Sequence, residues 1–103
     1  MAEFEITLSE SDSKGTFSMY APKDGHDVPV KSGEMTFSKA GEALWIFDHV
    51  EVNEDMKGTG AAMALVKYGV DVARKRNLKV IPLCPFAKAQ FKRHIEYHDV
   101  LKG

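Results

Sequence analysis

A chain of 103 residues, 44% hydrophobic and 28% charged, has the composition of an ordinary globular protein, and its length predicts one domain over residues 1–103. The formal net charge of −1 excludes a global basic field, and no apolar run is long enough to span a bilayer, so neither nucleic acid nor a membrane is an expected partner. The single cysteine excludes an internal disulfide, and Met1–Glu5 lacks the basic and apolar parts of a secretory signal, so a cytoplasmic protein is expected.

The first half of the chain predicts short antiparallel strands separated by turns. Apolar and polar residues alternate over Phe4–Leu8, which indicates a half-buried strand. Further strands are expected over Thr16–Ala21 and Val28–Ser38. Between them, Asp24-Gly25 is a strong hairpin signal because glycine readily adopts the positive φ of tight turns.

A central strand is predicted over Ala43–Val52. Its first half is apolar on both faces, so we expect other elements to cover both sides of the sheet there. Its second half alternates, with valines on one face and His49 and Glu51 on the other. Asp48 falls on the apolar side and needs a polar partner unless the sheet ends at that point.

The second half of the chain predicts one long helix and a final strand. Apolar residues recur at helical spacing over Gly60–Arg76, and a short buried strand follows over Leu78–Leu83. A short helix is expected over Phe86–His94, and then a polar tail. Strand, helix and strand make a βαβ unit, so the prediction is an α+β fold: antiparallel N-terminal strands feed one βαβ unit in a mixed sheet of about five strands.

The turn Lys57–Ala62 lies where the central strand hands over to the long helix. Its glycines and alanines let a ligand approach the backbone, and the unpaired N–H groups of the first helical turn attract an anion such as phosphate. The turn lacks a Walker A pattern. A dinucleotide fingerprint also fails, because Met63 stands where a third glycine is required and Lys79 where an acidic residue is expected.

The pattern Lys57-x-x-Gly60-x-Ala62 resembles the pyrophosphate motif of GNAT-type acetyltransferases, with lysine in place of the usual arginine or glutamine. The chain is similar to the very small single-domain GNAT N-acetyltransferases from about Gly15 to Leu101. The other segments that carry the likeness are Leu44–His49, Pro82–Phe86 and His94-x-Glu96-Tyr97.

This resemblance implies a GNAT-like fold and acetyl-CoA as cosubstrate, with no metal. Backbone N–H groups of the Lys57–Ala62 turn would hold the pyrophosphate, and the edge of the strand near His49–Val52 would bind the pantetheine arm. The acetyl group would lie in a gap between that strand and Leu83–Phe86. The residues expected to bind the coenzyme are His49, Val50, Val52, Lys57, Gly58, Thr59, Gly60, Ala61, Ala62, Cys84, Pro85 and Phe86.

Two departures accompany the likeness. Acidic residues precede the motif (Glu51, Glu54 and Asp55) and would repel phosphate unless they turn outward. Larger GNAT enzymes build the acceptor site with two helices after their first strand, and only Ser9–Lys14 stands in that place here. The acceptor site is therefore expected to be open.

Catalytic candidates follow from the expected position of the thioester. His49 has the proton affinity of a general base, and Glu51, acting through a water, is the competing choice. Cys84 is read as a small buried residue, as a wall of the acetyl site or as a transient acyl carrier. Tyr97 either protonates the departing thiolate or packs over the core. His94 and His98 have zinc-ligand spacing only if a helix continues through them, and no metal is expected.

Two basic clusters have more than one interpretation. Arg74-Lys75-Arg76 is most simply the exposed end of the long helix. Lys88, Lys92 and Arg93 could meet the 3′-phosphate of coenzyme A or an acidic partner, and the residues do not decide between these.

The functional prediction is an acetyl-CoA-dependent N-acetyltransferase, a monomer or weak dimer, that moves an acetyl group to a primary amine. The acceptor can be a protein lysine, a polyamine or a small metabolite amine. The alternative is a non-catalytic module that binds acetyl-CoA or coenzyme A, or a protein partner.

Overall fold

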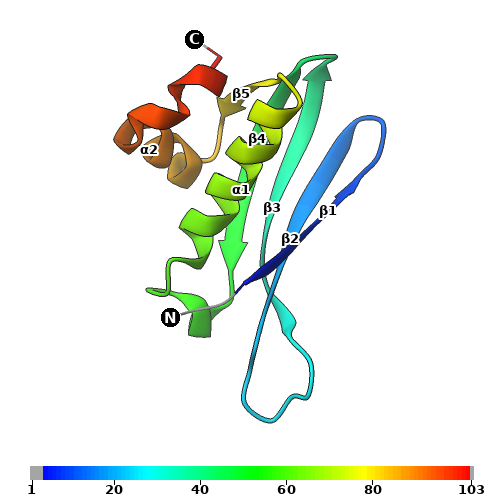
Figure 1. Ribbon diagram of the computed structural model, residues 1–103, viewed down its shortest axis with the longest axis vertical. Coiled ribbons are helices and arrows are strands. Elements are labelled where there is room, and N and C mark those ends of the chain that lie inside the picture. The colour runs from blue at the N-terminus through cyan, green and yellow to red at the C-terminus, as the bar shows by residue number, and fades with distance from the viewer. Residues whose placement is uncertain (1–3, 103) are drawn as a thin grey trace.

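Five strands form one mixed sheet in the computed structural model, which describes residues 4–102 (Figure 1). Their order in the sheet is their order in the chain: β1 (Glu5–Glu10), β2 (Lys14–Ala21), β3 (Val30–Gly41), β4 (Leu44–Val52) and β5 (Lys79–Pro82). The first four strands form an antiparallel meander, and β5 pairs with β4 in parallel. The predicted α+β architecture is confirmed.

The helix α1 (Ala61–Lys75) connects β4 to β5 and completes the βαβ unit (Figure 1). A short 3-10 helix, η1 (Glu54–Met56), precedes it. The predicted bounds of the long helix are correct to within one residue at each end. Asn77 follows the helix with a φ of 59°, the left-handed conformation that commonly ends helices, and basic residues occupy its last turn.

The core lies between the sheet and the helices α1 and α2 (Pro85–Arg93). The ring of Phe47 on β4 packs edge-on against Phe91 of α2, with centroids 6.3 Å apart. A Cβ added to Gly69 of α1 would lie 2.8 Å from the same ring. Phe47 therefore contacts both helices, which places them on the same face of the sheet.

The opposite face of the sheet carries no helix in the described part of the chain (Figure 1). The expectation that the first half of β4 is covered on both sides is therefore wrong. Trp45 and Phe47 are buried beneath the helices, whereas Leu44 and Ile46 on the other face are only half-buried. We call the uncovered side the open face.

The C-terminal segment also differs from the predicted polar tail. A second 3-10 helix, η2 (Ile95–Val100), packs Tyr97 and Val100 into the core, and Leu101 forms a parallel bridge to Val80 of β5. The two buried residues lie three positions apart, which matches one turn of a 3-10 helix and places both side chains on its inner side.

The turn between β2 and β3 contains the predicted Asp24-Gly25 reversal within a longer loop. Gly25 has a φ of 83°, and the N–H of His26 donates to the carbonyl of Lys23 at 3.1 Å. No helix among residues 4–102 has the length and apolar character needed to cross a lipid bilayer.

Candidate functional site

The strands β4 and β5 separate partway along their length. Their pairing runs from Leu44 opposite Lys79 to Phe47 opposite Pro82. The N–H groups of Leu83 and Cys84 then both donate to the carbonyl of Phe47, at 3.0 and 3.2 Å. Cys84 is the N-cap of α2, so the chain leaves the sheet at this point. A gap opens between the second half of β4 and the start of α2.

A β-bulge at Asp48 changes the facing of side chains along β4. Thr36 of β3 lies opposite His49 and Phe37 opposite Phe47, so Asp48 is the extra residue. Its carboxylate accepts a hydrogen bond of 2.6 Å from the hydroxyl of Ser38. This is the polar partner that Asp48 requires on a half-buried strand.

The bulge resets the alternation of the strand. Before the bulge, Trp45 and Phe47 face the helices, and after it Val50 and Val52 face the helices. His49 and Glu51 consequently point to the open face, where both are exposed. The sequence predicts the two faces of the second half of β4 correctly but not the extra residue that separates it from the first half.

The free backbone edge of β4 borders the gap. The N–H of Asn53 donates to the carbonyl of Ser32 on β3 at 2.8 Å. Successive residues of a strand direct their backbone groups to opposite edges, so those of Val50 and Val52 face away from β3. The ladder to β5 has already ended at Phe47, which leaves this edge available to a ligand.

The turn before α1 adopts the conformation that its glycines permit. Gly58 and Gly60 have φ values of 81° and 87°, and a Cβ on either would meet nothing within 4 Å. Their positive φ, and not lack of space, therefore requires glycine. The hydroxyl of Thr59 accepts a hydrogen bond from the N–H of Ala61 at 3.3 Å and donates to the carbonyl of Met56.

The start of α1 offers hydrogen-bond donors to an anion. The helix has no side-chain cap and no acidic residue in its first turn. Within residues 4–102, the N–H groups near the helix start that have no hydrogen-bond partner are those of Gly58, Gly60, Ala62 and Met63. These donors, together with the helix dipole, create a site suited to phosphate.

A cavity of about 730 Å³ joins the helix start to the free edge of β4. It is lined by Val50, Glu51, Val52, Met56, Lys57, Gly58, Gly60, Ala61, Ala62, Met63 and Phe86. Most of the residues expected to bind a coenzyme thus lie around one cavity. Met56 and Met63 were not expected, although a partly exposed methionine beside a glycine-rich turn is the kind of flexible apolar side chain that lines ligand sites.

The other predicted site residues lie around or beyond this cavity. Thr59 belongs to the turn, and Cys84 and Pro85 begin α2. His49 is on the open face, with its Nε2 3.9 Å from the carboxylate of Glu51. Cys84 is only 7% exposed and belongs to the hydrophobic core.

Tyr97 lies in the interior, away from the cavity lining. Its ring packs edge-on against Phe91 at 5.7 Å and lies 4.9 Å from the ring of His94. Burial, reinforced by the nearby charge of Glu96, raises the pKa of Tyr97, so its hydroxyl stays protonated at neutral pH.

The acidic residues near the turn are partly neutralised. Glu54 pairs with Lys57 at 2.7 Å, and Asp55 pairs with Lys23 at 3.6 Å. All four side chains are more than half exposed, so these pairs are weak and can exchange partners.

The two histidines with zinc-ligand spacing each have a separate partner. His94 Nδ1 lies 3.1 Å from a carboxylate oxygen of Glu96, and His98 Nε2 lies 2.8 Å from the carbonyl of Phe91. Among residues 4–102, no three His, Cys, Asp or Glu side chains gather closely enough to hold a metal ion.

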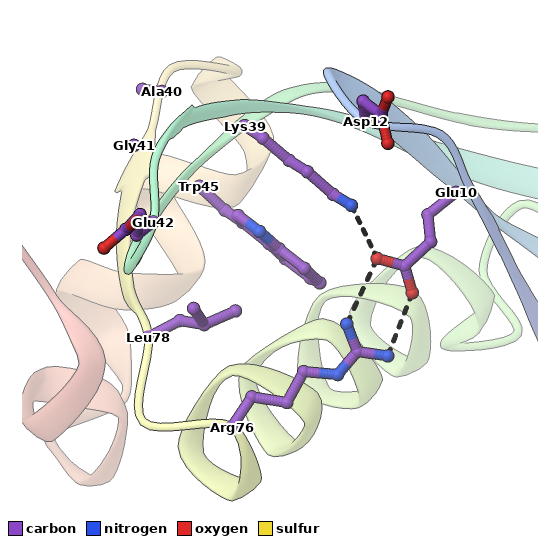
Figure 2. A pocket seen from close by; sticks show the side chains of 9 residues that line it. All are labelled: Glu10, Asp12, Lys39, Ala40, Gly41, Glu42, Trp45, Arg76 and Leu78. Atoms are coloured by element: carbon purple, nitrogen blue, oxygen red, sulfur yellow. Dashed lines mark hydrogen bonds and ion pairs between the residues drawn. The ribbon is translucent and has the colours of Figure 1, made fainter.

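A hollow of about 620 Å³ lies beside the β3–β4 hairpin and the end of α1 (Figure 2). Glu10 accepts hydrogen bonds from both terminal nitrogens of Arg76 at 3.1 and 2.9 Å, and it lies 2.8 Å from the amine of Lys39. These two cations lower the pKa of Glu10 to about 2. Because Glu10 already pairs with both, this hollow is less suited to an anion than the start of α1.

Comparison with known proteins shows the family and the fold of the chain. The sequence profile of the family described as GCN5-related N-acetyl-transferase matches residues 17–100. The fold is similar to the solution structure of a GCN5-like protein from Staphylococcus aureus, with a TM-score of 0.64 and 28% identity over 94% of this chain and 88% of that one. A comparison with curated proteins gives no match.

The ribosomal-protein-alanine N-acetyltransferase of Brucella melitensis biovar Abortus 2308 shares the fold, with a TM-score of 0.62 and 20% identity over 81% of this chain and 62% of that one. The profile match covers most of the chain. The protein therefore belongs to the GCN5-related N-acetyltransferase family, and the expected enzyme class, an N-acetyltransferase, is confirmed.

Proposed function

We propose that this protein transfers the acetyl group of acetyl-CoA to a primary amine, and that the cavity between α1 and β4 holds the coenzyme. The observation that carries the proposal is the meeting of two sets of free backbone groups in one cavity. The unpaired N–H groups at the start of α1 suit a pyrophosphate, and the free edge of β4 suits an amide-containing arm.

The pyrophosphate would bind the N–H groups of Gly58, Gly60 and Ala62, with Lys57 close by to add charge. The pantetheine arm would extend along Val50 and Val52 like a short additional strand. The side chains of Met56, Met63 and Phe86 would give the arm an apolar wall. The thioester would then lie in the gap where β4 and β5 separate.

In the reaction, the amine nitrogen attacks the thioester carbonyl, a C–N bond forms and the C–S bond breaks. A backbone N–H at the edge of β4 would stabilise the oxyanion. His49, or Glu51 acting through a water, would accept the proton lost by the amine, and both side chains lie on the open face. The acceptor would therefore approach from the open face. The sulfur leaves as the thiolate of coenzyme A and takes up a proton from water. Tyr97, the other expected donor, is buried against Phe91 and lies outside the cavity lining.

The acceptor is a primary amine of a protein lysine, a polyamine or a small metabolite.

One observation favours a second candidate function, a module that binds the coenzyme without turnover. The open face carries no helix among residues 4–102 that would enclose an acceptor. The two functions differ in one measurable respect, the release of free coenzyme A thiol in the presence of amines.

The first test is a thermal-shift titration with acetyl-CoA, coenzyme A and 3′-dephospho-coenzyme A. A ligand at about 100 times its dissociation constant stabilises the fold by about 2.7 kcal/mol, or about 10 °C in Tm for a domain of this size. Gly60→Asp should abolish the shift, because it adds a carboxylate to the phosphate site at a residue with positive φ. Its control is Gly25→Asp, which places the same strain in the β2–β3 loop, away from the cavity.

Turnover is then measured as thiol release from acetyl-CoA with a pool of amines. A rate above that of buffer excludes the module without turnover. The absence of any thermal shift at millimolar ligand would contradict the proposed coenzyme site itself.

A further inference from the structure

A groove of about 490 Å³ runs along the outer side of β5 and α2, separate from the coenzyme cavity. Its apolar lining includes Ile81, Leu83, Phe91 and Leu101. Leu83 is 63% exposed, so it presents apolar surface to the groove that it lines. An apolar groove of this kind is suited to a partner that contributes apolar side chains.

The groove has a cationic rim. Lys88 and Lys92 of α2 line it, with Lys102 and His98 nearby, and no acidic residue is in its lining. Neither Lys88 nor Lys92 forms an ion pair within residues 4–102. Seven other lysines and arginines pair with acidic side chains there: Lys23, Lys31, Lys39, Lys57, Lys67, Arg74 and Arg76. The partner of this groove should therefore be acidic.

The occupant does not dock as an additional strand. The outer edge of β5 is already used at Val80, whose carbonyl accepts a hydrogen bond of 2.9 Å from the N–H of Lys102. The next outward position is Pro82, which has no N–H to donate. Recognition must come from side chains: apolar groups on the floor and carboxylates against the lysines.

The groove adjoins the gap without sharing the coenzyme cavity. Leu83 lines the groove, and its N–H bonds to Phe47 at the point where β4 and β5 separate. On α2, Phe86 lines the cavity, whereas Lys88 and Lys92 line the groove. A segment seated in the groove would hold a neighbouring amine near the mouth of the gap.

We propose that this groove docks an acidic segment of an acceptor protein, one that carries large apolar side chains beside its carboxylates. The inference rests on the proposed transferase function and narrows the acceptor to a protein amine. The concave apolar floor favours a protein segment over nucleic acid, whose phosphate backbone would leave the floor unfilled. It also favours a protein over a lipid surface, which would meet the exposed rim and not the floor.

The test uses a short fluorescein-labelled peptide in which glutamates alternate with leucine and phenylalanine and one lysine supplies the amine. Binding is followed by fluorescence anisotropy, and turnover by thiol release. The peptide should bind the wild-type protein, and the double variant Lys88→Glu/Lys92→Glu should bind it about tenfold more weakly. A peptide with glutamine for glutamate, and one with serine for leucine and phenylalanine, should each bind more weakly than the first.

The matched control is Lys14→Glu/Lys75→Glu, which makes the same charge change at two exposed lysines outside the groove. It should leave peptide affinity unchanged. Both double variants should keep the thermal shift with acetyl-CoA, so a failure of the groove is distinguishable from a failure of the coenzyme site.

Three results would overturn the inference. The first is no peptide binding by a wild-type protein that acetyl-CoA stabilises. The second is a Lys88→Glu/Lys92→Glu variant that loses affinity for coenzyme A but not for 3′-dephospho-coenzyme A, because the lysines would then bind the 3′-phosphate. The third is binding of single-stranded RNA or phosphatidylserine vesicles through these lysines without binding of the peptide.

Discussion

At the scale of single residues, the pair formed by Lys57 and Glu54 limits the positive charge available at the start of α1. Lys57 lines the cavity, but its amine lies 2.7 Å from the Glu54 carboxylate. Both side chains are largely exposed, so the pair is easily broken and contributes little to stability. The carboxylate nevertheless repels any anion bound at the turn.

We expect Glu54→Gln to tighten coenzyme A binding about two- to fivefold, because it frees Lys57 and removes the repulsion. The gain should shrink at high ionic strength, where exposed charges are screened. Isothermal titration at low and high salt measures both effects. The control Glu42→Gln removes a carboxylate at the β3–β4 hairpin, outside the cavity. Equal affinity of Glu54→Gln and wild type would place the phosphates away from Lys57.

Cys84 is the second residue whose chemistry can be isolated. Its side chain is buried in the hydrophobic core, and its thiol makes no hydrogen bond among the described residues. We expect Cys84→Ala to keep turnover within a few-fold of wild type, since direct attack by the amine needs no acyl-cysteine. Thiol release and mass spectrometry of the acetyl-CoA-treated protein provide the measurement. A loss above about a hundredfold in a folded, coenzyme-binding variant would instead indicate a covalent step.

At the scale of elements, the bulge at Asp48 determines which side chains of the second half of β4 face the helices and which face the open face. The hydrogen bond from Ser38 to Asp48 joins β3 to the extra residue of β4, so it should hold the register of the second half of the strand. Ser38→Ala leaves a half-buried carboxylate without its donor. We expect a loss of about 1–2 kcal/mol in the free energy of unfolding and weaker acetyl-CoA binding.

Urea unfolding of Ser38→Ala, Asp48→Ala and the double variant measures the coupling between the two residues. The double variant should be less destabilised than the sum of the single changes, by about 1 kcal/mol. Ser18→Ala is the control, because Ser18 lies on the same open face and its hydroxyl makes no hydrogen bond within residues 4–102. Additive effects would show that the bulge is held by other contacts.

The secondary-structure elements also show how much of the fold can be predicted from the sequence. The strands and α1 were predictable because apolar residues recur at intervals of two and of three to four. The bulge was not, since the alternation on either side of Asp48 is regular and the extra residue appears only when β3 is paired with it. The helix η2 was not predicted because only two of its side chains, Tyr97 and Val100, are buried. Two apolar positions are too few to show a helical period.

The candidate site was predictable for a related reason. The turn Lys57–Ala62 is contiguous, so its residues are visible in one stretch of sequence, and the expected strand edge lies just before it. Met56 and Met63 flank the same turn and were passed over because their spacing carries no distinct signal. The groove beside β5 depends on residues from β5, α2 and the C-terminal segment, which only the fold brings together.

At the scale of the whole molecule, Glu10 ties the end of β1 to β3 and to the end of α1 (Figure 2). Its pKa falls from 4.5 to about 2 because Arg76 and Lys39 bond to the carboxylate. The folded pKa lies below the unfolded one, so the stabilisation is complete above pH 4.5 and is lost as the pH falls toward 2. The guanidinium of Arg76 also lies 5.4 Å from the ring centroid of Trp45, which joins the cluster to the core.

We expect Glu10→Gln to lower the free energy of unfolding by about 1 kcal/mol at pH 7, a value that allows for partial exposure of the ion pairs. The difference from wild type should shrink between pH 4.5 and 2 as Glu10 itself becomes protonated. Urea unfolding across this pH range measures it. A difference that stays constant with pH would mean that the carboxylate packs but does not pair.

The open face of the sheet has a consequence for the order in which the two substrates bind. The proposed coenzyme cavity lies at the start of α1, whereas His49 stands on the open face and is not part of the cavity lining. An acceptor amine that approaches from the open face would not block acetyl-CoA, so either substrate can bind first. Double-reciprocal plots of initial rate against acetyl-CoA at several amine concentrations should therefore intersect. Each product should be a competitive inhibitor only against the substrate that binds at the same site.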